Sequence, residues 1–279
     1  MPTTQIRGVT LNYEIHGTSG PWVALSPGGR RPLAGVETLA QKFAKAGYRV
    51  LIHDRRNCGA SDVSFEADGS EYEMWADDLK ALLDQHNAAP AIVGGGSSGC
   101  RLSLLFALRY PKDVRGLLLW RVTGGRFACE RLAEQYYGQY IKAAKAGGMQ
   151  AVCATEHWAE RIRDRPANRE RLMAMDVNRF VQVMEHWRTY FLKGADLPVI
   201  GCQEADLRSI KVPAIIIPGN DRVHGHASGA AAHRLIPGSE LADLFPGDQD
   251  IDLVPMEDWQ LREDEMARVL LDFLKRKGL

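Results

Sequence analysis

Segments typical of β-strands alternate with segments typical of amphipathic helices along most of this chain. Near its start, residues 21–29 and 48–56 are short apolar runs that end in loop residues. Between them, residues 35–47 repeat apolar side chains at helical spacing and end on Gly47, a common helix terminator. A strand, a helix and a second strand in this order are typical of a crossover between parallel strands. The alternation predicts an α/β fold with a mostly parallel, twisted sheet flanked by helices.

The same alternation continues to residue 123 and resumes after residue 206. Further strands are expected at 10–17, 89–95, 114–122, 212–221 and 239–245, and further helices at 71–87, 100–111, 226–236 and 263–278. Between the two parts, residues 124–206 have helical spacing and are rich in Glu, Arg, Ala and Met. We predict a core domain of residues 1–123 and 207–279 and a helical cap domain of residues 124–206. Ligand pockets favour such junctions.

Composition narrows the class of partner. The 279 residues carry 35 basic and 35 acidic side chains, and 45% of the chain is apolar, as in ordinary soluble globular proteins. This balance does not favour nucleic acid or an anionic membrane as a partner. No apolar run approaches the roughly 20 residues that span a bilayer, and the N-terminus lacks the pattern of a signal peptide. We expect a cytoplasmic protein that acts on a small-molecule substrate, with a homodimer left open.

The cysteines indicate neither disulfides nor a metal site. Their number is odd and they form no CxxC motif, the five positions being Cys58, Cys100, Cys129, Cys153 and Cys202. They also form no Cys/His cluster with metal-binding spacing. We expect reduced thiols, no metal and no organic cofactor.

The most informative motif is Gly95-Gly96-Ser97-Ser98-Gly99, which matches G-x-S-x-G. It lies between a predicted strand and a predicted helix, the context in which this motif holds a nucleophilic serine on a sharp turn. Small neighbours permit the turn, and the following helix N-terminus favours developing negative charge. A glycine-rich turn also serves packing or phosphate binding, so the motif alone leaves these alternatives open.

With this motif in place, the sequence resembles the α/β-hydrolase superfamily over nearly its whole length. Residues 20–29 resemble its oxyanion loop, 53–62 its D-x-R-G-x-G-x-S segment, 94–119 its nucleophile elbow, helix and next strand, and 210–223 the strand that delivers its acid. Capped esterases and hydrolases that cleave carbon–carbon bonds share this layout. The resemblance implies an α/β-hydrolase fold and a hydrolytic enzyme, without identifying the substrate.

The resemblance also implies roles for individual residues. Ser97 is the expected nucleophile, and the backbone N–H of Ser98 is one expected donor of the oxyanion hole. The second donor is expected from Gly29 or Arg30. Asp221 occupies the position of the catalytic acid. The alternative for Asp221 is a turn residue that closes a strand, which Asn-Asp pairs often do.

One part of the family pattern is missing from this sequence. The superfamily places its catalytic histidine after the last strand, yet this chain has no histidine after His233, and residues 241–259 offer acidic side chains instead. A serine hydroxyl needs a base to take its proton. The nearest candidates are His224 and His226, just beyond Asp221, and of the two we favour His224. The other histidines are expected to be structural or exposed, although His53 lies at a strand end beside Asp54.

Three explanations for the missing histidine stay open at this point. A histidine has moved to the loop of the acid, or the reaction is a cofactor-free lyase or decarboxylase reaction without an acyl-enzyme, or catalysis has been lost and the pocket only binds a ligand. In the lyase scheme Ser97 would hydrogen-bond to the substrate without attacking it, and a buried acid would move a proton near neutral pH. We favour the first explanation.

Substrate contacts are expected from the loop and from the cap. Arg30 follows the loop glycines, where a planar guanidinium could bind a substrate carboxylate, and surface charge is the alternative for it and for Arg31. The cap offers aromatic side chains for an apolar pocket, although most aromatics at helical spacing are core: Tyr136, Tyr137, Trp158, Trp187 and Tyr190. The resulting hypothesis is a hydrolase of a small or medium organic acid derivative with an ester, lactone or activated carbon–carbon bond.

Overall fold

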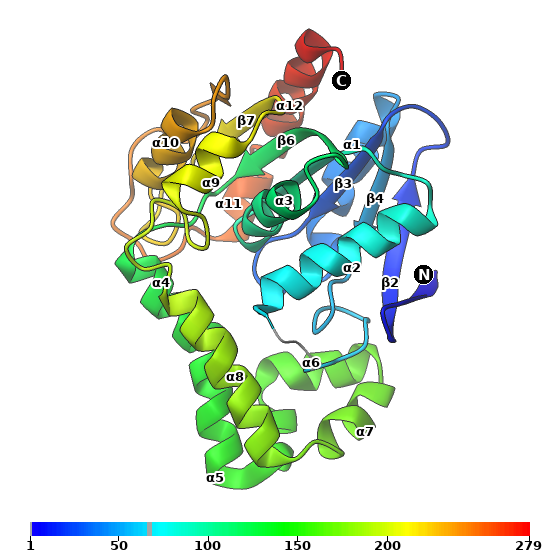
Figure 1. The fold of residues 1–279 in the computed structure, drawn as a ribbon, viewed down its shortest axis with the longest axis vertical. Helices are drawn as coiled ribbons and strands as arrows, with labels where there is room; N and C mark the ends of the chain where they lie inside the picture. Colours follow the sequence, from blue (N-terminus) through cyan, green and yellow to red (C-terminus); the bar gives the residue numbers. More distant parts are fainter. Residues whose placement is uncertain (1, 66–68) are drawn as a thin grey trace.

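A computed structural model describes residues 2–65 and 69–279, and it contains one eight-stranded sheet. Its strand order is β1-β2-β4-β3-β5-β6-β7-β8 (Figure 1). The strands are β1 Thr3–Ile6, β2 Val9–His16, β3 Trp22–Ser26, β4 Arg49–His53, β5 Ala91–Gly96, β6 Val114–Trp120, β7 Ala214–Ile217 and β8 Glu240–Leu241. Only β1 and β2 run antiparallel to their neighbours, and the other pairs are parallel. The predicted α/β fold with a mostly parallel sheet is confirmed.

Helices cover both faces of the sheet, and each face has its own apolar core. On one face the buried side chains of α2, α3 and α10 pack together, the helices spanning Glu71–Gln85, Ser98–Arg109 and His226–Leu235. On the other face α1, Glu37–Lys45, packs beside α12, Glu263–Lys277. The strands between these layers are apolar on both sides, as parallel strands usually are. The remaining core elements are short: η1 Leu33–Val36, α9 Glu204–Ser209 and α11 Met256–Gln260.

Helices inserted between β6 and β7 form a separate group, which lies below the sheet in Figure 1. This helical insert, residues 126–192, consists of α4 Arg126–Ala133, a π-helical turn Glu134–Gly138, α5 Gln139–Ala154, α6 Glu156–Asp164, α7 Ala167–Met173 and α8 Val177–Leu192. It falls within the segment predicted as a cap, whose boundaries stay a prediction. The helix α9 straddles the predicted boundary at residue 206 and lies beside α10 (Figure 1).

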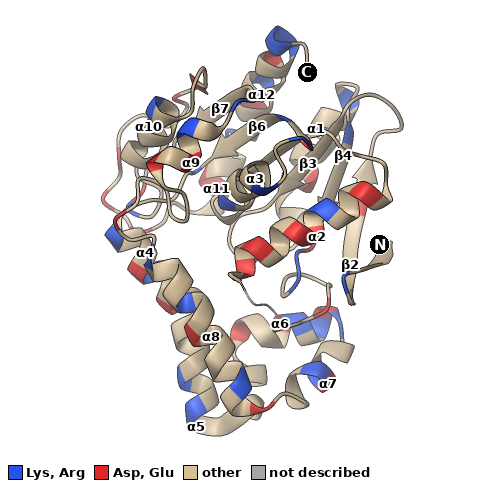
Figure 2. Ribbon diagram, viewed as in Figure 1, with Lys and Arg blue, Asp and Glu red and all other residues tan. Residues whose placement is uncertain are grey.

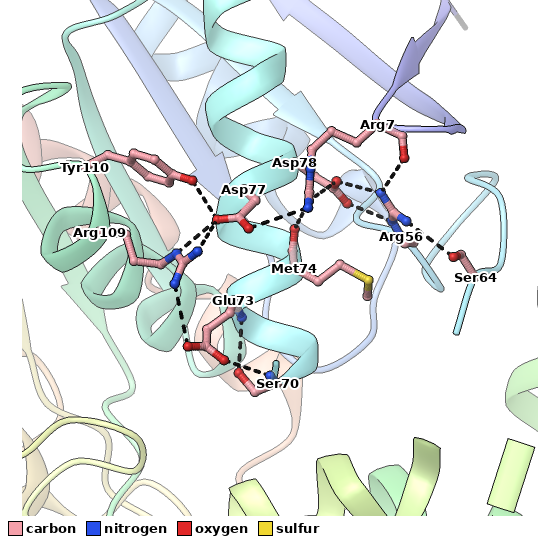
Figure 3. Close-up of polar contacts among 10 residues, drawn as sticks. All are labelled: Arg7, Arg56, Ser64, Ser70, Glu73, Met74, Asp77, Asp78, Arg109 and Tyr110. Carbon is pink, nitrogen blue, oxygen red and sulfur yellow. Dashed lines mark hydrogen bonds and ion pairs between the residues drawn. The ribbon is translucent and has the colours of Figure 1, made fainter. Parts of the chain in front are cut away.

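The helix α2 joins several parts of the core through acidic side chains, and Figure 2 shows how acidic residues recur along its ribbon. Asp78 accepts hydrogen bonds from Arg56 Nε and Nη2 at 2.9 and 2.7 Å and from Arg7 Nη1 at 2.9 Å (Figure 3). Asp77, on the same helix, accepts a bond from Arg109 of α3 at 2.9 Å. These contacts fix the start of the chain and the loop after β4 against α2. None of the helices within the described residues combines the length and the apolar character that a bilayer crossing requires.

Candidate active site

Ser97 lies in the sharp turn between β5 and α3. Its backbone has φ 54° and ψ −112°, a conformation that is uncommon for a residue with a side chain. The Ser97 N–H donates to the carbonyl oxygen of Trp120 at 3.0 Å, which anchors the turn to the neighbouring strand β6. A Cβ atom at Gly95 would lie 2.5 Å from the carbonyl carbon of Gly99, and one at Gly99 would collide with the carbonyl oxygen of Ser26. The glycines of the motif are therefore required by the close approach of β3, β5 and α3.

Three of the predicted residues form one continuous hydrogen-bonded chain. His224 Nε2 lies 2.8 Å from Ser97 Oγ, and His224 Nδ1 lies 2.9 Å from Asp221 Oδ1. An ionised carboxylate can only accept, so the Nδ1–H of His224 donates to Asp221 and Nε2 is left to accept the hydroxyl proton of Ser97. This is the geometry of a nucleophile, a base and the group that orients the base.

The loop after β7 explains how an acid and a base three residues apart both reach the site. Asp221 Oδ1 accepts bonds from the backbone N–H groups of Val223 at 3.0 Å and His224 at 2.7 Å. These bonds turn the chain back on itself, so that the imidazole lies against the same carboxylate. His226 points elsewhere, with Nε2 3.2 Å from Asp243 Oδ2.

The environment sets the charge state of this chain. Burial disfavours the charged form of Asp221, but the bonds from His224 and Val254 N–H and the charge of Arg121 together lower the pKa of Asp221. Burial lowers the pKa of His224 to about 4, and the positive charge of Arg121 adds to this effect against the opposing bond to Asp221. Asp221 is therefore ionised and His224 neutral at pH 7, the states that a proton-accepting base requires.

Ser97 and His224 line a cavity of about 430 Å³. Gly28 and Gly29 line it from the loop after β3, and the helical insert contributes Tyr136, Tyr140 and His157. Of the acidic side chains in residues 241–259, Glu257 lines the cavity, whereas Asp252 pairs with Arg222 and Arg131 at the surface. The cavity is thus polar as well as aromatic, and it is formed jointly by the core and the insert.

Of the predicted oxyanion donors, Gly29 lines the same cavity as Ser97, and Ser98 directly follows Ser97 in the turn. Gly29 has φ 53°, and its carbonyl oxygen accepts a bond from Arg55 Nη2 at 2.7 Å, which fixes the loop. Ser98 is the first residue of α3, where backbone N–H groups have no partner within the helix. Its hydroxyl bonds to Tyr72 at 2.7 Å in the protein interior. Their role as donors to an oxyanion stays a prediction.

Arg30 is buried at the edge of the cavity. Its Nη2 donates to Glu71 Oε2 at 2.8 Å, and burial and Glu71 act in opposite directions on its pKa, with a raised pKa as the result. Four aromatic rings of the insert surround the guanidinium. Their centroids lie 5.3 to 5.8 Å from Arg30 Cζ, and they belong to Tyr136, Tyr137, Tyr140 and Trp158. Its Nε and Nη1 have no hydrogen-bond partner among the described residues. Arg31 also lines the cavity but is exposed.

Other candidates lie away from the cavity or were not predicted. Trp187 is buried in the insert, Tyr190 is exposed, and His53 is buried with neither ring nitrogen bonded in the part of the chain that the structure describes. Sequence reasoning missed Arg121 and Glu71. The position of Arg121 at the end of a predicted strand was the available signal, because the carboxyl ends of parallel strands meet at one edge of a sheet.

Comparisons with known proteins agree with this architecture. Residues 23–120 match the family model described as the alpha/beta hydrolase fold. The "Uncharacterized hydrolase YraK" of Bacillus subtilis is 31% identical over 42% of each chain. A "2-hydroxy-6-oxononadienedioate/2-hydroxy-6-oxononatrienedioate hydrolase" of Paraburkholderia phymatum is 40% identical over 28% of this chain and 26% of the relative. The chain thus spans less than half the length of these curated relatives.

Solved structures match along nearly the whole chain. The enol-lactonase of Burkholderia xenovorans superposes with a TM-score of 0.65 at 22% identity, covering 98% of this chain and 100% of the enzyme. The meta-cleavage product hydrolase of Pseudomonas fluorescens gives 0.68 at 18% identity, covering 99% and 98%. The match of residues 23–120 to the family model and the likeness to these solved structures show that the chain has the α/β-hydrolase fold.

Proposed function

We propose that this protein is a serine hydrolase of small organic acid derivatives that contain an ester, a lactone or an activated carbon–carbon bond. The observation that carries this proposal is the unbroken chain of hydrogen bonds from Asp221 through His224 to Ser97 Oγ. The similar proteins support the same class, since they include an enol-lactonase and a meta-cleavage product hydrolase.

The reaction follows from the positions of these groups. Ser97 Oγ forms a bond to the substrate carbonyl carbon while its proton passes to His224 Nε2. The carbonyl oxygen becomes negative and accepts bonds from the N–H groups of Gly29 and Ser98. The bond to the leaving group then breaks, and that group takes the proton from His224. Water attacks the acyl-enzyme with the same base, which releases the acid and restores Ser97.

Arg30 indicates that the substrate carries a carboxylate. Its two unbonded nitrogens, Nε and Nη1, belong to one planar guanidinium at the cavity wall. Because these two nitrogens point to different sides of the guanidinium, we expect one of them to donate a single charge-assisted hydrogen bond to a carboxylate oxygen. Glu71 already holds the third nitrogen, so the guanidinium is fixed in orientation before substrate arrives.

The proposal is tested with pairs of small esters and lactones that differ only in bearing a free carboxylate or its neutral methyl ester. The wild-type protein is expected to prefer the carboxylate-bearing members, and Ser97→Ala is expected to lower kcat by at least about 10³-fold. Arg30→Lys keeps a charge beside Glu71 but loses the planar guanidinium and its fixed donor directions. We expect it to raise KM roughly tenfold for the carboxylate-bearing substrate only.

Two results would contradict the proposal. Turnover that persists in the Ser97→Ala variant would exclude an acyl-enzyme at Ser97 and favour the lyase mechanism. An equal rise in KM for both members of a pair would show that Arg30 does not bind the carboxylate.

A further inference from the structure

The base of this site depends on the acid to an unusual extent. His224 and Asp221 lie three residues apart on one loop, and the Nδ1 of His224 bonds only to the two oxygens of Asp221 among the described residues. The orientation of the imidazole toward Ser97 therefore depends on how firmly the Asp221 carboxylate is held. Oδ1 accepts the backbone N–H bonds from its own loop, and Oδ2 receives its backbone and guanidinium bonds from other elements.

Two groups outside the loop bond to Oδ2. The Val254 N–H donates at 2.9 Å, and Arg121 Nη2 donates at 3.1 Å. The same Nη2 donates to the carbonyl oxygen of Val254 at 3.2 Å, so Arg121 joins the acid to the segment that follows β8. In this chain, that segment supports Asp221 where the superfamily pattern led us to expect the histidine itself.

The position of Arg121 is built into the sheet. It directly follows β6 with φ 52°, and its N–H donates to the carbonyl oxygen of Ile217 at the end of β7 at 3.0 Å. The preceding residue, Trp120, is paired with Gly96 and accepts the Ser97 N–H. The guanidinium lies 4.9 Å from the ring centroid of Trp259 and is buried. One residue thus connects the strand beside the nucleophile to the loop that carries the acid and the base.

Arg121 also contributes charge at this point. The charged groups that influence the pKa of His224 are Asp221 on its own loop, Arg121 at the end of β6 and Arg131 on α4. Arg121 in turn faces Arg31 and Tyr136 across the cavity, and Glu257 and His157 line the same cavity. Arg121 is buried beside Asp221 and His224, whereas Arg131 is partly exposed and paired with Asp252. The charge of Arg121 therefore has the larger effect on the His224 imidazole.

We propose that Arg121 is the positioning residue of the relocated histidine: it holds Oδ2 of Asp221, keeps His224 oriented toward Ser97 and places a positive charge beside the pair. Its effect on turnover rests on the proposed function, but its effect on His224 does not. The role of Arg121 toward His224 can therefore be tested without a known substrate.

The experiment is a pH titration of His224 by NMR in protein labelled with ¹⁵N-histidine, with the resonance assigned through the His224→Gln variant. In the wild type we expect a midpoint near pH 4. Arg121→Gln removes the charge and one donor to Oδ2, and we expect the midpoint to rise by about one pH unit or more. If Arg121→Gln does not fold, Arg121→Met takes its place, because a Met side chain can pack against the Trp259 ring. Arg121→Lys keeps the charge and is expected to restore a low midpoint.

Arg131→Gln serves as the matched control, because it removes the other, partly exposed cation and is expected to shift the midpoint by much less. A midpoint that stays at the wild-type value in a folded neutral variant of Arg121 would overturn the proposal, as would an equal shift in Arg131→Gln. If a substrate is turned over, the acid limb of kcat/KM should move upward with the same midpoint. Absence of any Ser97 reactivity would refute the proposed function and leave the titration result valid.

Discussion

The buried ion pair of Arg30 with Glu71 belongs to the core and lies against the helical insert. Glu71 Oε2 accepts bonds from Arg30 at 2.8 Å and from Tyr137 of the π-helical turn at 3.1 Å. Arg161 of α6 also donates to the carbonyl oxygen of Arg30 at 3.4 Å. Both members of the pair are nearly inaccessible to water, so removing either one would leave a buried charge without its partner.

Removing the charge of Glu71 should therefore destabilise the protein. Glu71→Gln keeps the shape of the side chain but leaves the Arg30 cation uncompensated, and we expect a loss of about 3 kcal/mol in the free energy of unfolding. The matched control is Glu240→Gln, which breaks partly exposed pairs with Arg276 and Lys277 and should cost less than about 1 kcal/mol. Urea unfolding measures both. Equal small losses in the two variants would contradict a structural role for the buried pair.

At the scale of single residues, the sequence indicated which residues take part in the site better than it indicated which residues bond to one another. The motif and the resemblance selected Ser97 and Asp221, and the place of His224 just beyond Asp221 made it a candidate base. The pairing of Arg30 with Glu71 joins residues 41 positions apart, and it depends on the path of the loop after β3. The role of Arg121 likewise depends on contacts with Asp221 and Val254, which are distant in sequence.

At the scale of elements, close backbone contacts constrain the turn between β5 and α3. The strand β3 approaches so closely that α3 can begin only with a residue lacking a Cβ atom at position 99. The glycine pattern made this turn recognisable from sequence, because the chemistry of the turn and the local pattern agree.

Gly99→Ala should test this constraint. The added methyl group would collide with the backbone of Ser26, and we expect a loss of roughly 1–3 kcal/mol in the free energy of unfolding. Gly225→Ala is the control, because the nearest atom to its Cβ would be 3.7 Å away and its φ is −54°. Thermal unfolding of both variants measures the difference. A Gly99→Ala variant as stable as Gly225→Ala would show that β3 and α3 can separate at little cost.

Other elements were harder to predict because their local signal is weak. The edge strand β1 is four residues long, and its sequence Thr-Thr-Gln-Ile gains its strand conformation from pairing with β2. The last strand was expected over residues 239–245 but spans only Glu240–Leu241. The π-helical turn at Glu134–Gly138 has no distinct sequence pattern, since its apolar spacing is that of an α-helix.

At the scale of the whole molecule, folding buries neutral histidines. Burial lowers the pKa of His53 to about 3 and that of His224 to about 4, whereas both are near 6.5 in an unfolded chain. Between pH 6.5 and the folded-state pKa values, the unfolded chain binds more protons than the folded one. The free energy of unfolding should therefore decrease as pH falls below about 6.5.

His53 allows this pH dependence to be measured away from the site. At pH 5 its burial should cost on the order of 2 kcal/mol relative to pH 7, and His53→Leu should remove this part of the decrease. His16→Gln is the control, because His16 is only partly buried and lies 3.1 Å from Glu14. Urea unfolding at pH 7 and pH 5 gives the values for each variant. If the free energy of unfolding of His53→Leu falls as much between pH 7 and pH 5 as that of the wild type, burial of His53 does not cause the pH dependence.

The sequence offered two histidines for the place of the missing one, and the folded chain shows which of them faces Ser97. His224 and His226 were both candidates, and the bonds within the Asp221 loop turn His224 toward Ser97 and His226 toward Asp243. Two residues of separation point the side chains in different directions, and only the folded loop determines which one faces the cavity.

The most direct test of the account is labelling of the intact protein with a fluorophosphonate, followed by mass mapping of the adduct. We expect rapid modification of Ser97 in the wild type and in His226→Ala, and modification at least about 100-fold slower in His224→Ala, because the serine then lacks its base. Unmodified Ser97 in the wild type, or equal labelling with and without His224, would contradict the claim that the loop carrying Asp221 also supplies the catalytic base.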